Sequence, residues 1–166
     1  RGEIFFFLLC VALCFISLKA TIVVFILPFL ISRFIMMLGN WTQHAFIDPD
    51  DPGNPYKNSI TCINVRYNHR CWNDGYHISH HIQPTMHWTE HPNHFLQNKD
   101  EYAANNALVF DRMDFGGVFF NLMFHRYDKL ADHVLNLDNT YKSKEEIVEV
   151  LQERVKPFDR DNFKPV

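Results

Sequence analysis

"IFFFLLCVALCFISLKATIVVFILPFLISRFIMML", residues 4–38, carries only two charged side chains, Lys19 and Arg33. As one straight helix it would be roughly 50 Å long at about 1.5 Å per residue, well beyond the ~30 Å hydrocarbon layer of a bilayer. We therefore expect two apolar segments, residues 4–18 and 20–38, joined by a tight turn at SLKAT, with Lys19 at the lipid headgroups. The pattern predicts a transmembrane helical hairpin over residues 1–38.

Two other interpretations of this stretch are less favoured. A signal peptide would have a stronger basic start and a small-x-small cleavage site, and here the apolar sequence continues after Lys19. A buried helical hairpin in a soluble protein would keep more polar residues to face water. The first segment is short for a full span and the chain opens on Arg1, so we expect further sequence upstream.

Composition sets limits on the remaining possibilities. The chain has 166 residues, and its 16 basic side chains against 19 acidic ones give no electrostatic reason for a nucleic-acid partner. Cys10 and Cys14 lie in the apolar stretch, and Cys62 and Cys71 form no CxxC pair. We therefore expect no disulfide framework.

The polar remainder predicts short elements separated by loops. Proline, glycine, asparagine and aspartate mark a loop before residue 60, and ITCINV then indicates an extended stretch. We expect helices over residues 91–108, 116–130 and 143–155, the last with a capping box of Ser143 and Glu146, and an irregular tail over 156–166. The predicted fold is all-α: a membrane hairpin (1–38), a histidine-bearing membrane-surface region (39–96) and a helical cap with a tail (97–166).

The candidate chemistry lies in "NDGYHISHHIQP", residues 73–84. In a helix, His77, His80 and His81 share one face, and converging neutral imidazoles indicate a metal site. Asn40 and His44, also four residues apart, follow the second apolar segment and could reach the same site. Such a thiolate-free set suits iron, zinc, copper or nickel, and the chain has no HExxH motif of a zinc hydrolase.

"NWTQH" (40–44) followed by "DGYHISHHIQP" (74–84) resembles the C-terminal half of integral-membrane fatty acid desaturases, particularly the acyl-CoA type. The resemblance covers roughly residues 20–95. It implies that His44, His77, His80 and His81 are iron ligands and that Asn40 approaches the metal directly or through water. No catalytic residue beyond the metal ligands is implied, and Trp41 and Trp88 resemble substrate-lining or interfacial aromatic residues.

The resemblance also implies cofactors and partners. Two iron ions would activate O2, which removes two hydrogens from adjacent methylenes of an acyl chain carried by coenzyme A or by a lipid. A b-type cytochrome or a ferredoxin would supply the electrons. The implied location is the bilayer of the endoplasmic reticulum, with mitochondrial or plastid membranes as alternatives.

One departure from the family pattern limits these expectations. Two further histidine boxes, HxxxxH or HxxxH and a first HxxHH, do not occur in the 166 residues. The chain is therefore the C-terminal piece of a longer enzyme, one part of a split enzyme or an inactive relic, and alone it should not desaturate. A non-catalytic, desaturase-like subunit of a larger membrane complex and a related di-iron hydroxylase remain alternatives.

Several other polar residues have simpler expected roles. Asp74 and Asp48 could orient imidazoles, although turn or capping roles are favoured. We expect His87, His91 and His94 to line the mouth of the site or to make ordinary hydrogen bonds, and Arg33 to be paired or to snorkel. Three further histidines are interpreted as structural or surface residues: His69, His125 and His133.

Overall fold

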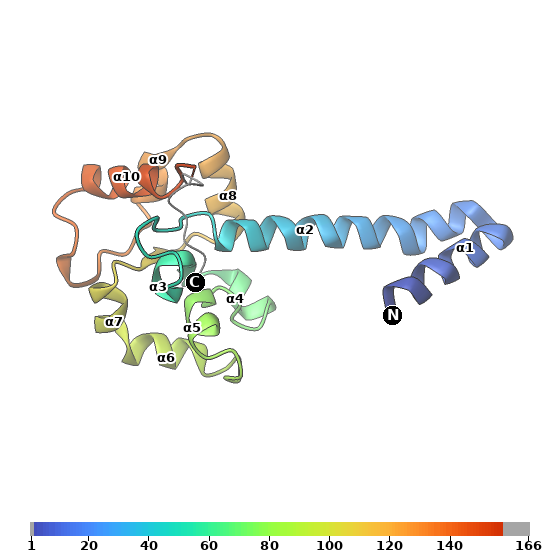
Figure 1. The fold of residues 1–166 in the computed structure, drawn as a ribbon, viewed down its shortest axis with the longest axis horizontal. Coiled ribbons are helices and arrows are strands. Elements are labelled where there is room, and N and C mark those ends of the chain that lie inside the picture. Colours follow the sequence, from blue (N-terminus) through green and yellow to red (C-terminus); the bar gives the residue numbers. More distant parts are fainter. Residues whose placement is uncertain (1, 158–166) are drawn as a thin grey trace. The chain divides into compact units, whose positions relative to one another are not determined.

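The computed structural model describes residues 2–157, so most of the expected tail lies outside the described residues. The chain divides into two compact units, Arg1–Asn40 and Trp41–Val166. The first unit is helical throughout its described part. The second is mostly helical and contains the two strands found in the described residues (Figure 1).

The first unit contains the helix α1 (Gly2–Thr21), the π-helical turn η1 (Ile22–Ile26) and the start of α2 (Leu27–Gln43), which runs on into the second unit. Ser17 interrupts α1 with extended backbone angles (φ −156°, ψ 100°). Its Oγ accepts a hydrogen bond from the Ala20 amide at 3.4 Å, and its carbonyl accepts one from Thr21 Oγ1 at 2.8 Å. Ser17 therefore caps the helix that follows it, and this break falls within SLKAT, where the turn was predicted.

The apolar segments contact each other across this break. The Phe6 ring stacks on Phe29 with centroids 5.1 Å apart, and Phe7 meets the same ring edge-on at 5.5 Å. Arg33 forms an ion pair with Glu3 and lies 5.2 Å over the Phe29 ring. Arg33 is thus paired, as one of the two expectations had it, and α1 folds back beside the helix that follows it (Figure 1).

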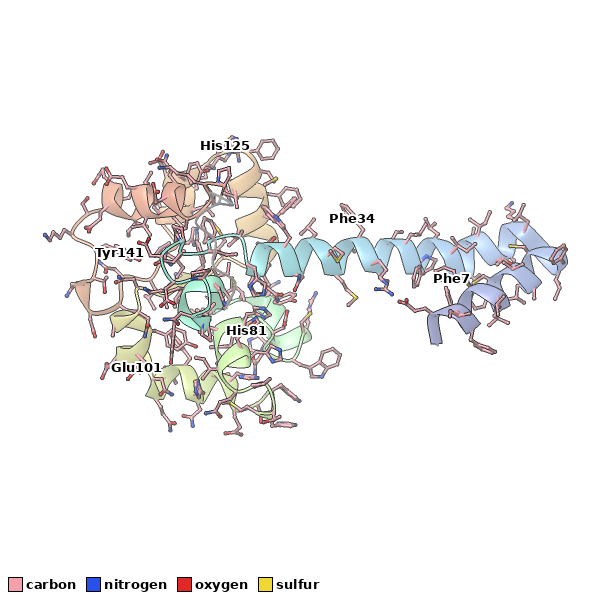
Figure 2. All side chains as sticks on the ribbon, viewed as in Figure 1. Phe7, Phe34, His81, Glu101, His125 and Tyr141 are labelled. Carbon is pink, nitrogen blue, oxygen red and sulfur yellow. The ribbon has the colours of Figure 1, made fainter. Side chains whose placement is uncertain are left out.

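Most apolar side chains of the first unit are exposed, including Phe15 (88%) and Ile16 (82%), and Figure 2 shows Phe34 and Phe7 on this surface. Within the described residues, the helical run Gly2–Gln43 is the one that is long and apolar enough to cross a membrane, with a mean hydropathy of 2.6. Residues 18–43 alone would measure roughly 39 Å, enough for one span. That this run forms a transmembrane hairpin stays a prediction.

The second unit is built around two short parallel strands, β1 (Ile60–Ile63) and β2 (Leu108–Asp111), with Ile60 opposite Leu108. Its helices are α3 (Pro55–Asn58), α4 (Arg66–Arg70), α5 (His77–Ile82), α6 (His91–Gln97), α7 (Lys99–Ala104), α8 (Phe115–Met123), α9 (Tyr127–Ala131), the 3-10 turn η2 (Leu137–Asn139) and α10 (Lys144–Glu153). The chain is mostly helical, as predicted, but the strand pair corrects the all-α expectation.

Two of the predicted helices are broken. The helix expected over 91–108 ends at Asn98, restarts as α7, and then passes through Asn106 (φ 51°) into β2. The helix expected over 116–130 breaks at His125 (φ 52°) into α8 and α9. A single left-handed residue ends a helix, and its sequence signal is weak when the residue is not glycine.

The extended stretch and the last helix agree with the prediction. ITCI forms β1, and α10 begins after Ser143, whose Oγ accepts a hydrogen bond from the Glu146 amide at 3.4 Å. The Glu146 carboxylate accepts from the Lys142 amide rather than from that of Ser143, so only half of the expected capping box forms. Ile147 and Leu151 of the predicted apolar stripe are buried.

The strand pair separates two hydrophobic cores, because successive residues of a strand face opposite sides. Ile60, Cys62, Leu108 and Phe110 belong to the core that α8, α9 and α10 cover. On the other face, Ile63 and Val109 join a core with residues of α5, α6 and α7. The helix that carries the histidine cluster, α5, is therefore fixed to the sheet by its own buried residue Ile78.

Candidate metal centre

His44 follows directly after α2, within the second unit. Its Nδ1 lies 2.7 Å from the backbone carbonyl of Asn58. A carbonyl oxygen only accepts hydrogen bonds, so Nδ1 carries the proton and the Nε2 of the neutral ring presents a lone pair. A histidine held in this way by a backbone carbonyl has the arrangement of a metal ligand.

The segment before α5 is fixed to β1 and α4. The Cys62 amide donates to the Gly75 carbonyl at 2.7 Å, and the Gly75 amide donates to Asn68 Oδ1 at 2.9 Å. A Cβ at Gly75 would lie 2.1 Å from Asn68 Oδ1 and 2.6 Å from the Cys62 carbonyl. Only glycine fits this position, and the close approach sets where α5 begins.

Asp74 connects the two parts of the site. Its Oδ2 accepts hydrogen bonds from Gln43 Nε2 at 2.9 Å and from the Tyr67 hydroxyl at 2.6 Å. Gln43 immediately precedes His44, and Asp74 lies three residues before His77, so this carboxylate limits how far the two ligand segments can separate. Burial, together with the hydrogen bond to Asp74, raises the pKa of Tyr67 well above its usual value, which keeps the hydroxyl a donor.

Asp48, the other aspartate considered as a partner of the imidazoles, lies elsewhere in the second unit. Its carboxylate accepts a hydrogen bond from the Asp50 amide and pairs with Arg154 at 3.4 Å and with Lys57 at 3.8 Å. Its bonds are those of a turn and an ion-pair cluster, in line with the favoured interpretation.

Three of the four predicted ligand histidines come together at their Nε2 atoms. The distance is 3.2 Å from His44 to His77, 3.2 Å from His44 to His81 and 3.1 Å from His77 to His81. All three ligand atoms lie within 4.8 Å of one another, the spacing of a site that could hold an ion. Figure 2 marks His81 in this unit.

Hydrogen bonds alone cannot satisfy this triangle. Each imidazole nitrogen is either a donor, when it carries a proton, or an acceptor, when it does not. Among three nitrogens in mutual contact, at least two must be of the same kind, so at least one of the three contacts joins two donors or two acceptors. A cation bound by three lone pairs removes this conflict.

The distances and protonation states fit a metal. Imidazole binds zinc at about 2.0–2.1 Å, so two imidazoles at roughly right angles around such an ion have nitrogens about 3 Å apart. Burial, followed by the neighbouring His81, His44 and His80, lowers the pKa of His77 to about 3. Burial, then His44 and His80, also lowers the pKa of His81. Both rings are therefore neutral near pH 7, which is the form that binds a metal.

The Nδ1 atoms of the triangle's histidines, which point away from the shared Nε2 contacts, differ in their hydrogen bonds. His44 Nδ1 has its carbonyl partner, whereas His77 Nδ1 is buried and no described residue accepts a hydrogen bond from it. An unpaired buried polar atom costs about 1–3 kcal/mol. His77 therefore lacks, within residues 2–157, the second hydrogen bond that usually orients a ligand histidine.

A family model for fatty acid desaturases matches residues 1–112, a range that includes every histidine of the triangle. The chain belongs to the fatty acid desaturase family. No curated protein and no solved structure matches it. Membership of this family supports a desaturase-like function in general terms. Desaturases are typically membrane-bound, and a desaturase family generally implies iron as the cofactor.

The remaining predicted ligands lie outside the triangle. His80 is exposed, and its ring centroid is 5.7 Å from that of His77 and 5.8 Å from that of His81. Asn40 lies in α2, four residues before His44 and at the end of the first unit. The ligand roles of all five residues, His44, His77, His80, His81 and Asn40, stay predictions for this desaturase-family chain.

A cavity of about 600 Å³ is lined by His77 and His80 of the box. His87 and His91, two of the three histidines expected at the mouth of the site, line it, and His94 is not among its lining residues. Trp88 also lines the cavity, whereas Trp41 meets Phe119 edge-on at 5.8 Å. A substrate-binding role for either tryptophan of this desaturase-family chain stays a prediction.

Sequence reasoning missed the partners that support the site. The Asn58 carbonyl is a backbone atom and leaves no side-chain signal. Gln43 and Tyr67 could have been noticed only by asking which donors a half-buried aspartate next to the box would need. These partners become visible once α2, α4 and the segment before α5 are seen in contact.

Proposed function

We propose that this chain supplies three histidines of the iron centre of a membrane fatty acyl desaturase. The observation that carries the proposal is the triangle of His44, His77 and His81 in a chain that belongs to the desaturase family. The triangle joins a residue next to the apolar helices with the histidine box, as a membrane-surface metal site requires.

The residues of the chain act by holding and orienting. The Asn58 carbonyl holds the proton of His44 on Nδ1, so that the Nε2 lone pair faces the box. Burial keeps His77 neutral, and Asp74 holds the segments of His44 and His77 together through Gln43. Bound iron would supply the activation of O2 that is needed to remove two hydrogens from adjacent methylenes.

The partners of the proposed enzyme follow from the family and from the first unit. Its exposed apolar side chains suit a helical hairpin in a bilayer, and the endoplasmic reticulum is the proposed membrane. The substrate would be an acyl chain on coenzyme A or on a lipid, and the electron donor a b-type cytochrome or a ferredoxin. The other histidine boxes would come from sequence outside these residues or from a second polypeptide.

The test is iron content and product in the protein as it occurs in its membrane. His77→Ala and His81→Ala should each remove iron and abolish the unsaturated product while leaving expression unchanged. His69→Ala, on an exposed histidine of α4, is the matched control and should retain both. Iron retained at the wild-type level in both ligand variants would refute the proposal.

A second candidate is a non-catalytic, desaturase-like subunit of a larger membrane complex; the 166 residues themselves contain neither of the two further family boxes. The same purification separates the two. Wild-type protein that holds no iron but co-purifies with a stable assembly would favour the subunit. Hydroxylated rather than unsaturated product would favour the related hydroxylase, because the ligand set does not fix the reaction outcome.

A further inference from the structure

The helix α8 has apolar side chains on both of its sides. Asn121 is the one polar side chain among its nine residues. On one side, three residues are buried in the core of the second unit: Phe115, Val118 and Leu122. On the opposite side, Phe120 is 61% exposed and Met123 is 46% exposed. A helix without a polar side does not suit water on its exposed surface, and an exposed apolar patch marks a site of contact with another molecule or a membrane.

The exposed side of α8 continues beyond its last residue. Phe124 follows directly after the helix and is 65% exposed. Phe119 is half-buried, and its ring meets that of Phe120 edge-on with centroids 5.5 Å apart. We call Phe119, Phe120, Met123 and Phe124 the outer face of α8. Three of these four side chains are exposed among residues 2–157, which is unlike the buried aromatic residues of the core beneath them.

Trp41 joins the outer face to the end of the apolar run. Its ring meets Phe119 edge-on with centroids 5.8 Å apart and is itself 46% exposed. Trp41 belongs to the second unit, and it lies in α2 just after the apolar run of residues 4–38 (Figure 1). Tryptophan is enriched at membrane–water interfaces, because its ring is apolar and its N–H is polar. The outer face is therefore continuous with the position where the chain is proposed to leave the bilayer.

Two cations stand at the C-terminal end of the outer face. The Arg126 guanidinium lies 5.3 Å over the Phe124 ring, and Lys129 follows in α9, with Asp128 between them in sequence. Both basic side chains are exposed, and neither forms a salt bridge with another residue of 2–157. Lysine and arginine next to an apolar helix face attract anionic lipid headgroups while the apolar side chains enter the layer beneath.

We infer that α8 is an interfacial membrane helix: its outer face enters the boundary between headgroups and acyl chains, and Arg126 and Lys129 bind the phosphates of anionic lipids. The inference rests on the proposed membrane hairpin and adds a second lipid contact, in the helical cap of residues 97–166. A lipid surface is favoured over a protein partner, because the outer face contacts Trp41 at the bilayer exit and its cations complement anionic headgroups. This contact would hold the second unit on the membrane independently of α2.

The test is the quenching of introduced tryptophans by lipids with brominated acyl chains. The whole chain is reconstituted in vesicles of phosphatidylcholine and phosphatidylglycerol, and the wild type gives the background of its three tryptophans. Phe120→Trp and Phe124→Trp keep an aromatic ring at exposed positions, and each should add blue-shifted emission, most of which the brominated lipid removes. The matched control is Glu149→Trp, on the exposed side of α10, which should emit at longer wavelength and stay unquenched.

Leu30→Trp, at an exposed position of α2, separates the inference from the proposed function. Quenching in Leu30→Trp with none in either α8 variant overturns the inference. Blue-shifted but unquenched emission from the α8 variants also overturns it and assigns the outer face to a protein partner. Equal quenching in Glu149→Trp overturns it as well, because lipid contact would then not be particular to α8. Absence of quenching in Leu30→Trp would instead refute the membrane hairpin itself.

The role of the cations is tested in the Phe124→Trp background. Arg126→Gln and Lys129→Gln each remove one charge and keep a polar side chain of similar reach. Each should reduce the quenching in vesicles that contain phosphatidylglycerol and leave it unchanged in vesicles of phosphatidylcholine alone. Undiminished quenching in both variants with phosphatidylglycerol present would overturn the assignment of these cations to lipid phosphates.

Discussion

The two compact units treat their apolar side chains in opposite ways. In Arg1–Asn40, Phe15 is 88% exposed and Ile16 82% exposed, and the polar contacts include a serine cap and an arginine pair. In Trp41–Val166, Phe46, Phe110 and Leu151 are completely buried around a strand pair. The same residue types are therefore exposed in one unit and buried in the other, the contrast expected for the proposed bilayer surroundings of the first unit and for water around the second.

The contrast shows that the cost of an exposed apolar side chain depends on the medium that surrounds it. In water, the surface of the first unit would cost far more than the few aromatic contacts inside it return. In hydrocarbon the same surface is neutral, and the requirement shifts to satisfied backbone groups, which the helical hydrogen bonds on either side of the break at Ser17 provide. Four predictions test this comparison.

Truncating a phenylalanine to alanine should give the largest difference between the two units in the loss of unfolding free energy. Phe110→Ala removes a completely buried ring from β2 and should lower the free energy of unfolding by about 3–5 kcal/mol. Phe15→Ala removes a ring that touches little protein and should change it by no more than about 0.5 kcal/mol. Denaturant unfolding in detergent measures both, and equal losses would contradict the comparison.

A charge in the apolar run should prevent stable membrane insertion. Leu30→Lys, at an exposed position of α2, places an ammonium near the middle of the apolar segment 20–38 and should cost about 2.5–3.5 kcal/mol of insertion free energy. The measurement is the protein fraction that stays in the membrane after an alkaline carbonate wash. The control is Gln97→Lys at the exposed end of α6. If both variants stay membrane-bound to the wild-type extent, the first unit does not span the bilayer.

Replacing a glycine with alanine should change the free energy of unfolding in opposite directions in the two units. Gly75→Ala forces a methyl group against Asn68 and the Cys62 carbonyl and should destabilise the second unit by about 1–3 kcal/mol. Gly39→Ala, where nothing lies within 4 Å, should stabilise α2 by up to about 1 kcal/mol. Thermal unfolding of the two variants side by side provides the measurement, and a Gly75→Ala variant as stable as the wild type would show that Gly75 is not sterically confined.

Replacing either of the two serine caps should change the stability least, and the comparison of the two losses reports on the surroundings of each cap. Ser143→Ala removes the cap of α10 in water and should cost about 1 kcal/mol. Ser17→Ala removes a cap of the same geometry at the turn whose Lys19 is expected among the headgroups, where the freed amide still reaches water, so its cost should be similar. Amide hydrogen exchange at Ala20 and Glu146 compares the two, and a much larger loss at Ser17 would place the turn in hydrocarbon instead.

The parts of the fold that depend on local pattern could be predicted from the sequence. The break in the apolar run at SLKAT, the strand at Ile60 and the start of α10 all have signals within a few residues. The strand β2 had none, because Leu108–Asp111 becomes a strand by pairing with residues nearly fifty positions earlier. Non-local pairing of this kind overrides the local preference of a short apolar segment.

The site divides in the same way. The i, i+4 spacing of His77 and His81 was sufficient to predict that they share a face, and the structure brings His44 to them. The positions of His80 and His91 depend on how α5 meets α6, and the Asp74 contacts depend on where α2 ends. The spacing of residues along the chain predicts which of them share a face of one helix or strand. These contacts instead join elements that are distant in sequence.

The acceptor that orients His44 is part of the main chain, and this has a practical consequence. Replacing the Asn58 side chain leaves the carbonyl in place, so point variants at this position should not re-aim the imidazole. Inserting or deleting a residue between positions 48 and 57 would shift the carbonyl itself. Loop length, rather than loop composition, is therefore the means by which this protein could be retuned without altering a single histidine.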